Sequence, residues 1–435
     1  MRNMTDAITL DRDSILSPSE IFTMLPHRRA LTSICVVATL LYTYWLRYAT
    51  SDGLHGGPSH HFRADKAVNS TLNFSKIFVI NLPARTDRRD ALAGAATASN
   101  LSLTWVDGLT GTDVEDIGVR NSGARGSWRS HMNAVQAIVD ENLGSALIME
   151  DDVDWDVRLK GQLWDFAAAS RTWLVASKSQ GNSQEGRHEP RSELLGPVPP
   201  ALRGKRDGDD PVREEVERTT IAPNAALPPS GTSQNVYGDG WDVLWLGHCG
   251  THLPGNTTQI SPLKVAILND ETVPAPQHLK PHPFALRDKL TDAYPPHTRV
   301  IHAAEGNMCS LGYAVSQQGA RKMLRRFGKD FVYQWDLMLR DWCQGEYNTT
   351  LIKGKDGKGT EDEEPVCITV QPPLISHHYA EGGSSDILSQ GGGFAKGTGS
   401  PYIRLSVRQN LRRLVMGLPE REMVDQLPDD LKPIW

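Results

Sequence analysis

The sequence has little of several features that mark common classes of protein. Positive charge is not in excess, because 46 lysines and arginines stand against 52 aspartates and glutamates and the formal net charge is -6. A general nucleic-acid binder needs a basic patch or a strongly basic domain, so this balance argues against one. No cysteine spacing is typical of a zinc site, and no internal repeat occurs. What is present is a chain of 435 residues, 39% of them hydrophobic, which is enough to bury at least one large core.

One uncharged hydrophobic stretch decides the predicted compartment. Residues 30 to 46 (ALTSICVVATLLYTYWL) are flanked by arginines, and their length lies at the lower limit of a membrane-spanning helix, about 17 to 25 residues. We predict a single-pass type II protein of the Golgi or endoplasmic reticulum membrane. Its parts are a cytosolic tail at residues 1 to 29, the anchor at 30 to 46, a flexible stem at 47 to 75 and a lumenal domain. A cleaved signal peptide is the alternative, since small residues follow the stretch.

Two further features agree with a lumenal domain. Glycosylation sequons of the form N-x-S/T follow the anchor at Asn69, Asn73, Asn100, Asn256 and Asn348. Of the five cysteines, Cys35 lies in the apolar stretch, which leaves an even set of four: Cys249, Cys309, Cys343 and Cys367. An oxidising lumen permits two disulfides in one of three pairings, and four buried free thiols are the other possibility.

Alternating patterns past the stem predict an α/β fold with a doubly wound sheet. The predicted elements are a strand at residues 77 to 82 (IFVINL), a helix at 88 to 99, a strand at 103 to 106, a helix at 130 to 141, a strand ending at Glu150 and a strand at 241 to 247. Strands that alternate with helices are typical of sheets covered on both faces.

Three segments interrupt this pattern. Residues 177 to 240 are polar and rich in proline and charge, so we predict a disordered insertion there. Residues 255 to 297 and 353 to 365 read as irregular insertions. The remainder is sized for one domain at residues 76 to 390, followed by a C-terminal tail at 391 to 435.

An acidic cluster follows the third predicted strand. In GSALIMEDDVDWD, residues 144 to 156, a buried apolar run ends in Glu150, Asp151, Asp152 and Asp154. Ligands of open α/β sheets bind outside the carboxyl ends of the strands, and carboxylates there can hold a hard divalent cation against a phosphate. Glu150 and Asp152 are two residues apart and point to the same side of an extended segment. Acids after a strand also cap the next helix at its positive end, so both interpretations stay open.

Seven motifs in order resemble the family-25 glycosyltransferases, which include lipooligosaccharide and collagen galactosyltransferases. They are IFVINLPARTDRRDAL, LTWVDGLTG, GSWRSHMNAVQAIV, SALIMEDDVDW, DVLWLG, CSLGYAVSQQGARKML and QPPLISHHYAEGGSSDI. The resemblance implies a GT-A type nucleotide-sugar-binding fold with a doubly wound mixed sheet. It also implies inverting, metal-dependent transfer of a hexose, by default galactose, from a UDP-sugar to a glycan or glycoprotein acceptor, usually with Mn²⁺. A catalytically inactive scaffold of the same fold, binding glycans or proteins, is the alternative.

The resemblance also assigns residues on the donor side. Its donor-loop motif falls on Asn81, Leu82, Arg85, Asp87 and Arg88, its serine-histidine pair on Ser130 and His131, and its acidic motif on Glu150, Asp151 and Asp152. Guanidinium groups bind phosphate oxygens in a bidentate manner, so Arg85 and Arg88 are expected at the diphosphate. We expect Glu150, Asp152 and His377 to hold Mn²⁺ or another divalent cation, because imidazole ligates manganese beside carboxylates. His378 follows His377, where many relatives have a polar residue, and Asp386 of the closing Ser385 to Ile387 motif is a further metal-positioning candidate.

The acceptor side needs a general base, and a carboxylate opposite the leaving group serves this purpose. Asp336 follows the family's YxxSxxGA helix, here Tyr313, Ser316, Gly319 and Ala320, and we expect it to be the base. Glu305 and Asp242 are alternatives, and an ordinary cap or salt bridge is also open. Trp335 and Trp342 are candidate aromatic platforms for an acceptor sugar.

Overall fold

The computed structural model describes residues 68 to 114, 122 to 183, 219 to 224, 235 to 255, 261 to 279, 289 to 328, 331 to 347, 364 to 379 and 398 to 432. All of them belong to one compact unit, His61–Trp435. The predicted cytosolic tail and anchor, Cys35, the sequons at Asn256 and Asn348 and the Ser385 to Ile387 motif lie outside the described residues. None of the described helices combines the length and the apolar character that a membrane span requires.

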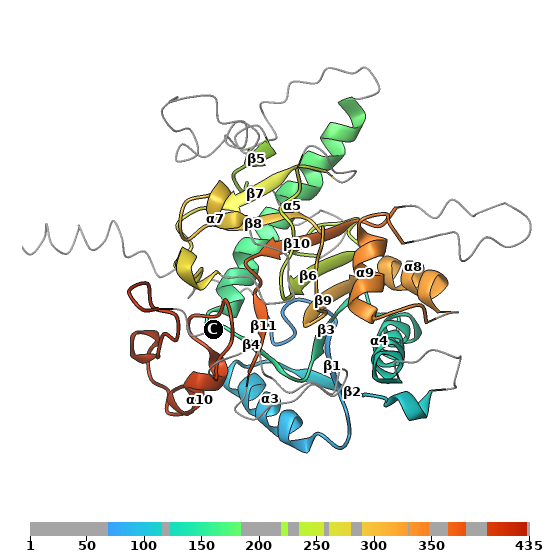
Figure 1. Cartoon of the computed structure of the whole chain (residues 1–435), viewed down its shortest axis with the longest axis horizontal. Helices are drawn as coiled ribbons and strands as arrows, with labels where there is room; N and C mark the ends of the chain where they lie inside the picture. Colours follow the sequence, from blue (N-terminus) through green and yellow to red (C-terminus); the bar gives the residue numbers. More distant parts are fainter. Residues whose placement is uncertain are drawn as a thin grey trace, which may run out of the picture. The chain divides into compact units, whose positions relative to one another are not determined.

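The described strands form one large mixed sheet (Figure 1). They are β1 (Lys76–Asn81), β2 (Leu103–Asp107), β3 (Ser145–Glu150), β4 (Val153–Trp155), β5 (Thr220–Ile221), β6 (Val243–Gly247), β7 (Lys264–Ile267), β8 (Arg299–Ala303), β9 (Gly312–Ser316), β10 (Cys367–Gln371) and β11 (Ile375–His377). The strand order is β2-β1-β3-β9-β6-β10-β8-β7-β5, and β4 pairs with β11 beside β6. Pairing of β1 with β2 and β3 is parallel, whereas β9 is antiparallel to both β3 and β6. The strands β1, β3 and β6 therefore end at the same edge of the sheet.

Helices cover both faces of this sheet (Figure 1). They are α3 (Thr86–Ala98), α4 (Ser122–Asp140), α5 (Leu159–Ser183), α7 (Leu290–Ala293), α8 (Gln317–Phe327), α9 (Trp335–Cys343) and α10 (Val407–Val415). One core contains residues of α3 and α5, and the other contains residues of α4, α8 and α9. Side chains alternate between these cores along β1, β3, β6 and β9, so that in β1 Ile77 and Val79 enter the first core and Phe78 the second. Because both faces of these strands are buried, their sequences are nearly continuous apolar runs.

The predicted elements of the N-terminal half are present with small shifts in their ends. The strands predicted at 77 to 82 and 103 to 106 are β1 and β2, and the helix predicted at 88 to 99 is α3. The helix predicted from residue 130 begins earlier, at Ser122. The YxxSxxGA motif was predicted to be a helix, but its first part is a strand. The strand β9 runs through Ser316, and the helix α8 begins at Gln317. The Ser316 hydroxyl caps α8 by accepting a hydrogen bond from the Gly319 amide, 3.0 Å away.

Two predicted boundaries of the domain are wrong. The folded core begins before Lys76, because Val68, Leu72 and Phe74 of the predicted stem are buried in the first core. The ring of Phe74 stacks on Tyr237 with centroids 4.8 Å apart. The predicted C-terminal tail is also part of the fold, since Ile403, Val407 and Leu427 are buried. In both cases apolar side chains spaced among polar ones gain enough from burial to order the segment.

The predicted insertions are ordered where the structure describes them. The strand β7 lies inside residues 255 to 297 and pairs with β8, which makes that part of the segment regular rather than irregular. The helix α5 extends past residue 177, and β5 lies within the predicted disordered insertion. Residues 184 to 218, which hold most of its charge runs, lie outside the described residues.

The four cysteines left by Cys35 form two disulfides. Cys249 is bonded to Cys309, and Cys343 to Cys367, with Cα atoms 5.5 and 5.6 Å apart. One bridge joins the segment after β6 to the segment before β9, and the other joins the end of α9 to β10. Of the three possible pairings, the structure selects this one.

The close packing of β11 on β6 and β9 generates a stability prediction. A Cβ atom at Gly247 would lie 2.8 Å from the Gly312 nitrogen and 3.0 Å from the Ile375 carbonyl oxygen, so only glycine fits there. We expect Gly247→Ala to lower the free energy of unfolding by about 1 to 3 kcal/mol, as overpacking does. Urea denaturation measures this value. Gly144→Ala is the matched control, because the nearest atom to its Cβ is 3.8 Å away; equal stability of both variants would refute the account.

Candidate active site

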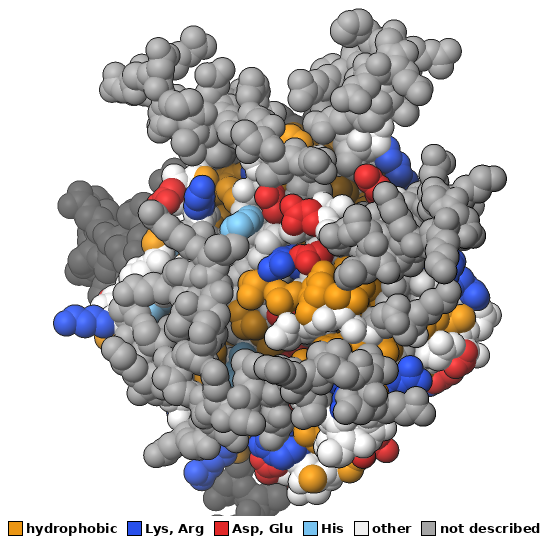
Figure 2. All heavy atoms as spheres, turned by 45° about the vertical axis from the view of Figure 1, so that its right-hand side comes forward, with side chains coloured by type: hydrophobic (Ala, Val, Ile, Leu, Met, Phe, Trp, Pro, Cys, Tyr) orange, Lys and Arg blue, Asp and Glu red, His pale blue; other side chains and the backbone are white. Residues whose placement is uncertain are grey.

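The candidate site lies at the edge where β1, β3 and β6 end. Asp151 and Asp152 form the turn between β3 and β4, and β4 runs antiparallel to β11 with Val153 opposite His377. This pairing brings the acidic cluster next to a histidine that follows it by more than two hundred positions in the chain. Figure 2 shows acidic side chains, a basic side chain and a histidine gathered in the middle of one face of the molecule.

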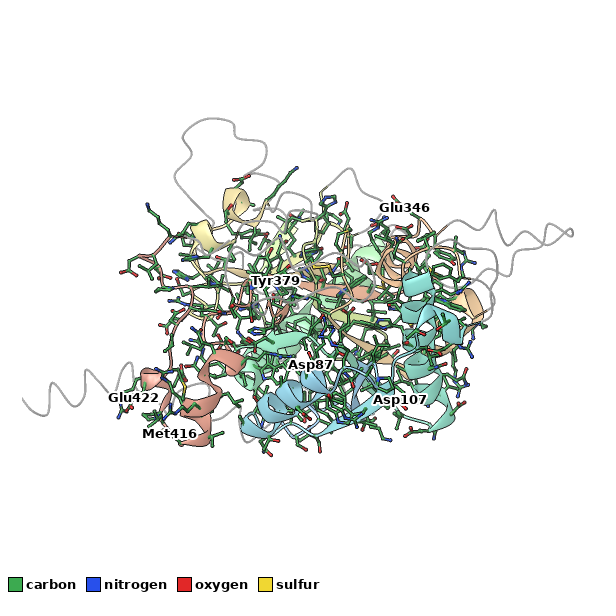
Figure 3. All side chains as sticks on the ribbon, turned by 60° about the horizontal axis from the view of Figure 1, so that its bottom comes forward. Asp87, Asp107, Glu346, Tyr379, Met416 and Glu422 are labelled. Atoms are coloured by element: carbon green, nitrogen blue, oxygen red, sulfur yellow. A yellow bond between two sulfur atoms is a disulfide. The ribbon has the colours of Figure 1, made fainter. Side chains whose placement is uncertain are left out.

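Arg88 joins the two aspartates of the turn. Its Nη1 atom donates to Asp151 Oδ1 at 2.8 Å and to Asp152 Oδ2 at 2.9 Å. The side-chain amide of Asn81, at the end of β1, donates to the other oxygen of Asp151, also at 2.8 Å. Three residues of the predicted donor side, Asn81, Arg88 and Asp151, are therefore brought together. The backbone oxygen of Arg85 accepts a hydrogen bond from the Asn81 side-chain amide at 3.1 Å, whereas its guanidinium pairs with Asp87 at the start of α3. Asp87 is labelled in Figure 3.

Asp152 also lies beside His377. Asp152 Oδ2 lies 3.3 Å from His377 Nε2. Burial alone would lower the pKa of His377, but the Asp152 carboxylate outweighs it and holds this pKa above its ordinary value. Burial likewise opposes ionisation of Asp152, yet His377 and Arg88 hold its pKa below the ordinary range. The ring of Tyr379, labelled in Figure 3, lies with its centroid 4.3 Å from that of His377.

Glu150 ends β3 beside this pair. Its Oε1 accepts a hydrogen bond from the Ser310 hydroxyl at 2.8 Å. Burial and then the charge of Asp152 raise the pKa of Glu150 to about 8, and Asp336 contributes in the same direction. The side chain is still 25% exposed, so ligands can reach the carboxylate.

His131 lies behind Glu150 rather than in the open site. Its Nδ1 is 2.8 Å from the Tyr313 hydroxyl, and its Nε2 is 3.9 Å from Glu150. The ring stacks on Trp335 with centroids 5.2 Å apart. Burial lowers the pKa of His131 to about 3, so the imidazole is neutral. This position supports Glu150 from the interior and leaves His131 out of direct reach of a donor molecule.

Asp336 lies in the first turn of α9, and its charge acts on Glu150. Its carboxylate accepts a hydrogen bond from the Cys309 amide at 2.9 Å, and burial raises its pKa. The two alternatives for the base lie elsewhere. Asp242 precedes β6 at the opposite edge of the sheet and is paired with Lys322 at 2.8 Å. The backbone oxygen of Glu305 accepts from the His252 amide, and the charge of Glu346 adds to the burial that raises the Glu305 pKa.

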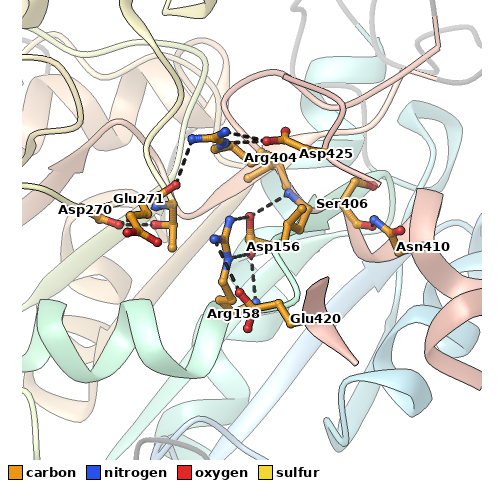
Figure 4. Close-up of polar contacts among 12 residues, drawn as sticks. Asp156, Arg158, Asp270, Glu271, Arg404, Ser406, Asn410, Glu420 and Asp425 are labelled. Carbon is orange, nitrogen blue, oxygen red and sulfur yellow. Dashed lines mark hydrogen bonds and ion pairs between the residues drawn. The ribbon is translucent and has the colours of Figure 1, made fainter. Parts of the chain in front are cut away.

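The fourth acid, Asp154, has a structural role. It is fully buried, and its Oδ2 accepts hydrogen bonds from the hydroxyls of Ser400, at 2.6 Å, and Ser406. Asp156 then accepts from the Leu405 amide and from Arg158 (Figure 4). Asp154 therefore ties β4 to the C-terminal segment, residues 398 to 432, which agrees with Glu150 and Asp152 being the better ligand candidates.

The C-terminal segment also contributes a residue that sequence reasoning missed. Arg408 of α10 donates to the backbone oxygens of Val153, at 2.8 Å, and Asp151, at 3.1 Å. It thereby holds the turn that carries the acidic cluster. No pattern in the sequence indicates this role, because residues 398 to 432 lie beyond the motifs that carry the family resemblance. Ser310 lies within the motif CSLGYAVSQQGARKML and was missed because a lone serine beside a cysteine is an ordinary sequence.

The two tryptophans expected to stack on an acceptor sugar are interior residues. Trp335 is 2% exposed and stacks on His131, and Trp342 is 7% exposed and packs edge-on against Phe327. Both belong to the core beneath α8 and α9. The predicted platform role is therefore wrong for them. The backbone amide of His378 donates to the Asp152 carbonyl at 2.8 Å, whereas its ring Nδ1 lies 2.9 Å from the Ser400 hydroxyl.

The predicted metal ligands are only partly assembled. Among the described residues, no three His, Cys, Asp or Glu side chains are grouped so that they would hold a metal ion by themselves. However, Asp152 Oδ1 and His377 Nδ1 are buried and have no hydrogen-bond partner in the described part of the chain. Buried polar atoms without a partner are costly, and an oxygen next to an imidazole is a donor set that suits a divalent cation. The residues therefore fit such an ion, provided that a ligand or water supplies further oxygens.

A cavity of about 350 Å³ lies elsewhere in the unit. Its walls are formed by Ala98 to Leu101, Trp155 to Val157, Leu159 and Lys160. None of the predicted site residues lines it, so the cluster at the sheet edge, rather than this cavity, is the candidate site.

Comparison with known proteins shows that the chain resembles glycosyltransferases of family 25. Procollagen galactosyltransferase 1 of Danio rerio is 31% identical over 125 residues, which are 24% of this chain and 21% of the relative. Procollagen galactosyltransferase 1-B of Xenopus laevis is 25% identical over 139 residues, 27% of this chain and 23% of the relative. Inactive glycosyltransferase 25 family member 3 of Homo sapiens is 25% identical over 134 residues, 26% of this chain and 22% of the relative. The matches thus span less than a quarter of each relative. No family model matches the chain.

The Asp154 contacts generate a prediction about the C-terminal segment. Asp154→Ala removes the acceptor of two buried hydroxyls and leaves them unpaired, so we expect the free energy of unfolding to fall by about 3 kcal/mol. Chemical denaturation checks this, and limited proteolysis should cut the segment of residues 398 to 432 sooner in the variant. Asp140→Ala is the control, because Asp140 is exposed and its carboxylate accepts a hydrogen bond from Gln136 of the same helix. A variant as stable as this control would show that Asp154 does not anchor the segment.

Proposed function

We propose that the chain is a metal-dependent glycosyltransferase that moves a hexose from a UDP-sugar to a glycan or glycoprotein acceptor. The observation that carries this proposal is the Asp152 and His377 pair, with Arg88 bonded to Asp152, at the carboxyl edge of the mixed sheet. The names of the relatives favour galactose as the sugar.

Each residue at the edge has a role in this proposal. Asp152 and His377 would hold Mn²⁺ or another divalent cation, with Glu150 beside them. Such an ion, when bound, stabilises the negative charge of a departing nucleotide diphosphate as a Lewis acid. Arg88 places a positive charge at the same edge, where guanidinium suits phosphate oxygens, and Asn81 and Asp151 hold the arginine in place. Arg85 lies at the start of α3, close enough in sequence to join them when a donor binds.

Asp336 is the proposed general base. An inverting transfer requires a carboxylate to take the proton of the acceptor hydroxyl. The pKa of Asp336 is raised by burial, which brings its basicity closer to that task than an exposed aspartate. Its charge also reaches Glu150, so the two carboxylates border one site.

The two disulfides support the proposed lumenal location of this domain. Cys249 and Cys309, and Cys343 and Cys367, are within bonding distance in the folded unit. Disulfides persist in the oxidising secretory pathway and are rare in the cytosol. We therefore place the domain in the lumen of the Golgi or endoplasmic reticulum, behind the anchor expected at residues 30 to 46.

A second function has one observation in its favour. One relative is named an inactive glycosyltransferase, which is compatible with a scaffold that binds glycans or proteins without turnover. The assembled pair of Asp152 and His377 favours the enzyme, because a scaffold has no need of buried, unpaired ligand atoms.

Hydrolysis of the donor distinguishes a glycosyltransferase from an inactive scaffold. We expect the purified chain to release UDP from a UDP-sugar, with UDP-galactose the first donor to try, only when Mn²⁺ is present. Asp152→Asn keeps the size of the side chain but removes its charge, so we expect the rate of release to fall by about a hundredfold. The assay is a coupled measurement of free UDP. Asp113→Asn, at an exposed position of a short 3-10 helix, should match the unmodified chain.

Two outcomes would contradict the proposal in different ways. Unchanged release by Asp152→Asn would refute the metal assignment while keeping the enzyme. Absence of release with any UDP-sugar, in protein that binds UDP or glycans, would favour the scaffold.

A further inference from the structure

Three consecutive residues contact both sides of the candidate site. The Cys309 amide donates to the carboxylate of Asp336 at 2.9 Å. The Ser310 hydroxyl donates to Glu150 Oε1 at 2.8 Å, and the Leu311 carbonyl accepts from the Glu150 amide at 3.1 Å. The segment of residues 309 to 311, here called the bridging segment, therefore joins the proposed donor-side acid to the proposed base.

The bridging segment is held from several directions. Its first residue is bonded to Cys249, and the Cys309 carbonyl accepts a hydrogen bond from Trp245 Nε1 at 3.1 Å. The Cys249 amide donates to the carbonyl of Met308 at 2.7 Å. Cys309 has a φ of 65°, in the left-handed region that costs energy for a residue with a side chain. Such a conformation persists only where the surroundings hold it, and here the disulfide and these hydrogen bonds do so.

Ser310 is suited to hold a carboxylate in one place. It is buried, and its hydroxyl reaches the one side-chain oxygen of Glu150 that also faces His131. A hydrogen bond to a charged or partly charged group is stronger than one between neutral groups, so its removal frees the Glu150 side chain to rotate.

We propose that Ser310 is a positioning residue for sugar transfer and that the Cys249 to Cys309 disulfide fixes the segment that carries it. This inference rests on the proposed function. It adds that the spacing between Glu150 and Asp336 is set by one short segment rather than by the two side chains independently. Small misplacements of reacting groups are costly in catalysis, so loosening the bridging segment lowers the turnover number.

The first test compares serine variants of the whole chain, assayed with a UDP-sugar and Mn²⁺ for release of UDP. We expect Ser310→Ala to lower kcat by about ten- to a hundredfold, with a smaller change in the KM for the donor. Ser310→Thr keeps the hydroxyl and should recover most of the activity. Ser170→Ala is the matched control, because Ser170 is also buried and hydrogen-bonded, to the Tyr237 carbonyl, but lies on α5 away from the site.

The second test removes one disulfide at a time. Replacing Cys249 and Cys309 together by serine should lower kcat by an amount similar to Ser310→Ala. The same exchange at Cys343 and Cys367 removes a disulfide that joins α9 to β10 and does not include the bridging segment, and kcat should fall less. Combining Ser310→Ala with the loss of the first disulfide should cost less than the product of the two separate factors, because both act through one segment.

The outcomes separate this inference from the proposed function. Equal kcat for Ser310→Ala, Ser170→Ala and the unmodified chain would overturn the inference, while the proposed function would stand. No turnover by the unmodified chain would overturn both. If Ser310→Ala does not fold, as judged by thermal unfolding, the two disulfide variants decide the matter. Equal losses of kcat in that pair would then contradict a special role for the bridging segment.

Discussion

The backbone pairing of β4 with β11 is the constraint on which the candidate site depends. It places Val153 opposite His377, and it puts the imidazole next to Asp152 although the two residues come from opposite halves of the chain. The strand β11 is in turn seated by Gly247 and Gly312, where the absence of side chains lets Ile375 approach the sheet. The chemistry of the acidic cluster therefore depends on close packing that involves no charged residue.

Two sets of contacts stabilise the short pair of β4 and β11. From one side, Arg88 neutralises the charge of Asp151 and Asp152, which otherwise repel one another across a turn. From the other side, Asp154 and Arg408 fasten β4 and the turn to the C-terminal segment. The four acids of the cluster therefore have different roles. Asp154 stabilises the fold, Asp151 orients an arginine, and Glu150 and Asp152 remain available to a ligand.

Much of this arrangement was predictable from the sequence, and the exceptions have physical reasons. The first strands and helices follow from continuous apolar runs and helical periodicity, and the acidic cluster was correctly expected at the end of a buried strand. The C-terminal segment was mistaken for a tail because it lies beyond the motifs of the family resemblance, and tertiary contacts with Asp154 and Asp156 hold it in place. Trp335 and Trp342 were misplaced because a sequence does not show which tryptophans face the core. The roles of Ser310 and Arg408 depend on contacts between distant segments, which no local pattern encodes.

The central claim is that Asp152 and His377 together form a site for a divalent cation and a nucleotide diphosphate. Electron paramagnetic resonance of Mn²⁺ titrated into the protein with UDP tests it most directly, because free and bound Mn²⁺ give different signals. The account predicts that Mn²⁺ binds in the presence of UDP and that His377→Ala weakens this binding by about tenfold or more. Binding of the same strength in His377→Ala and in the unmodified chain would contradict the claim.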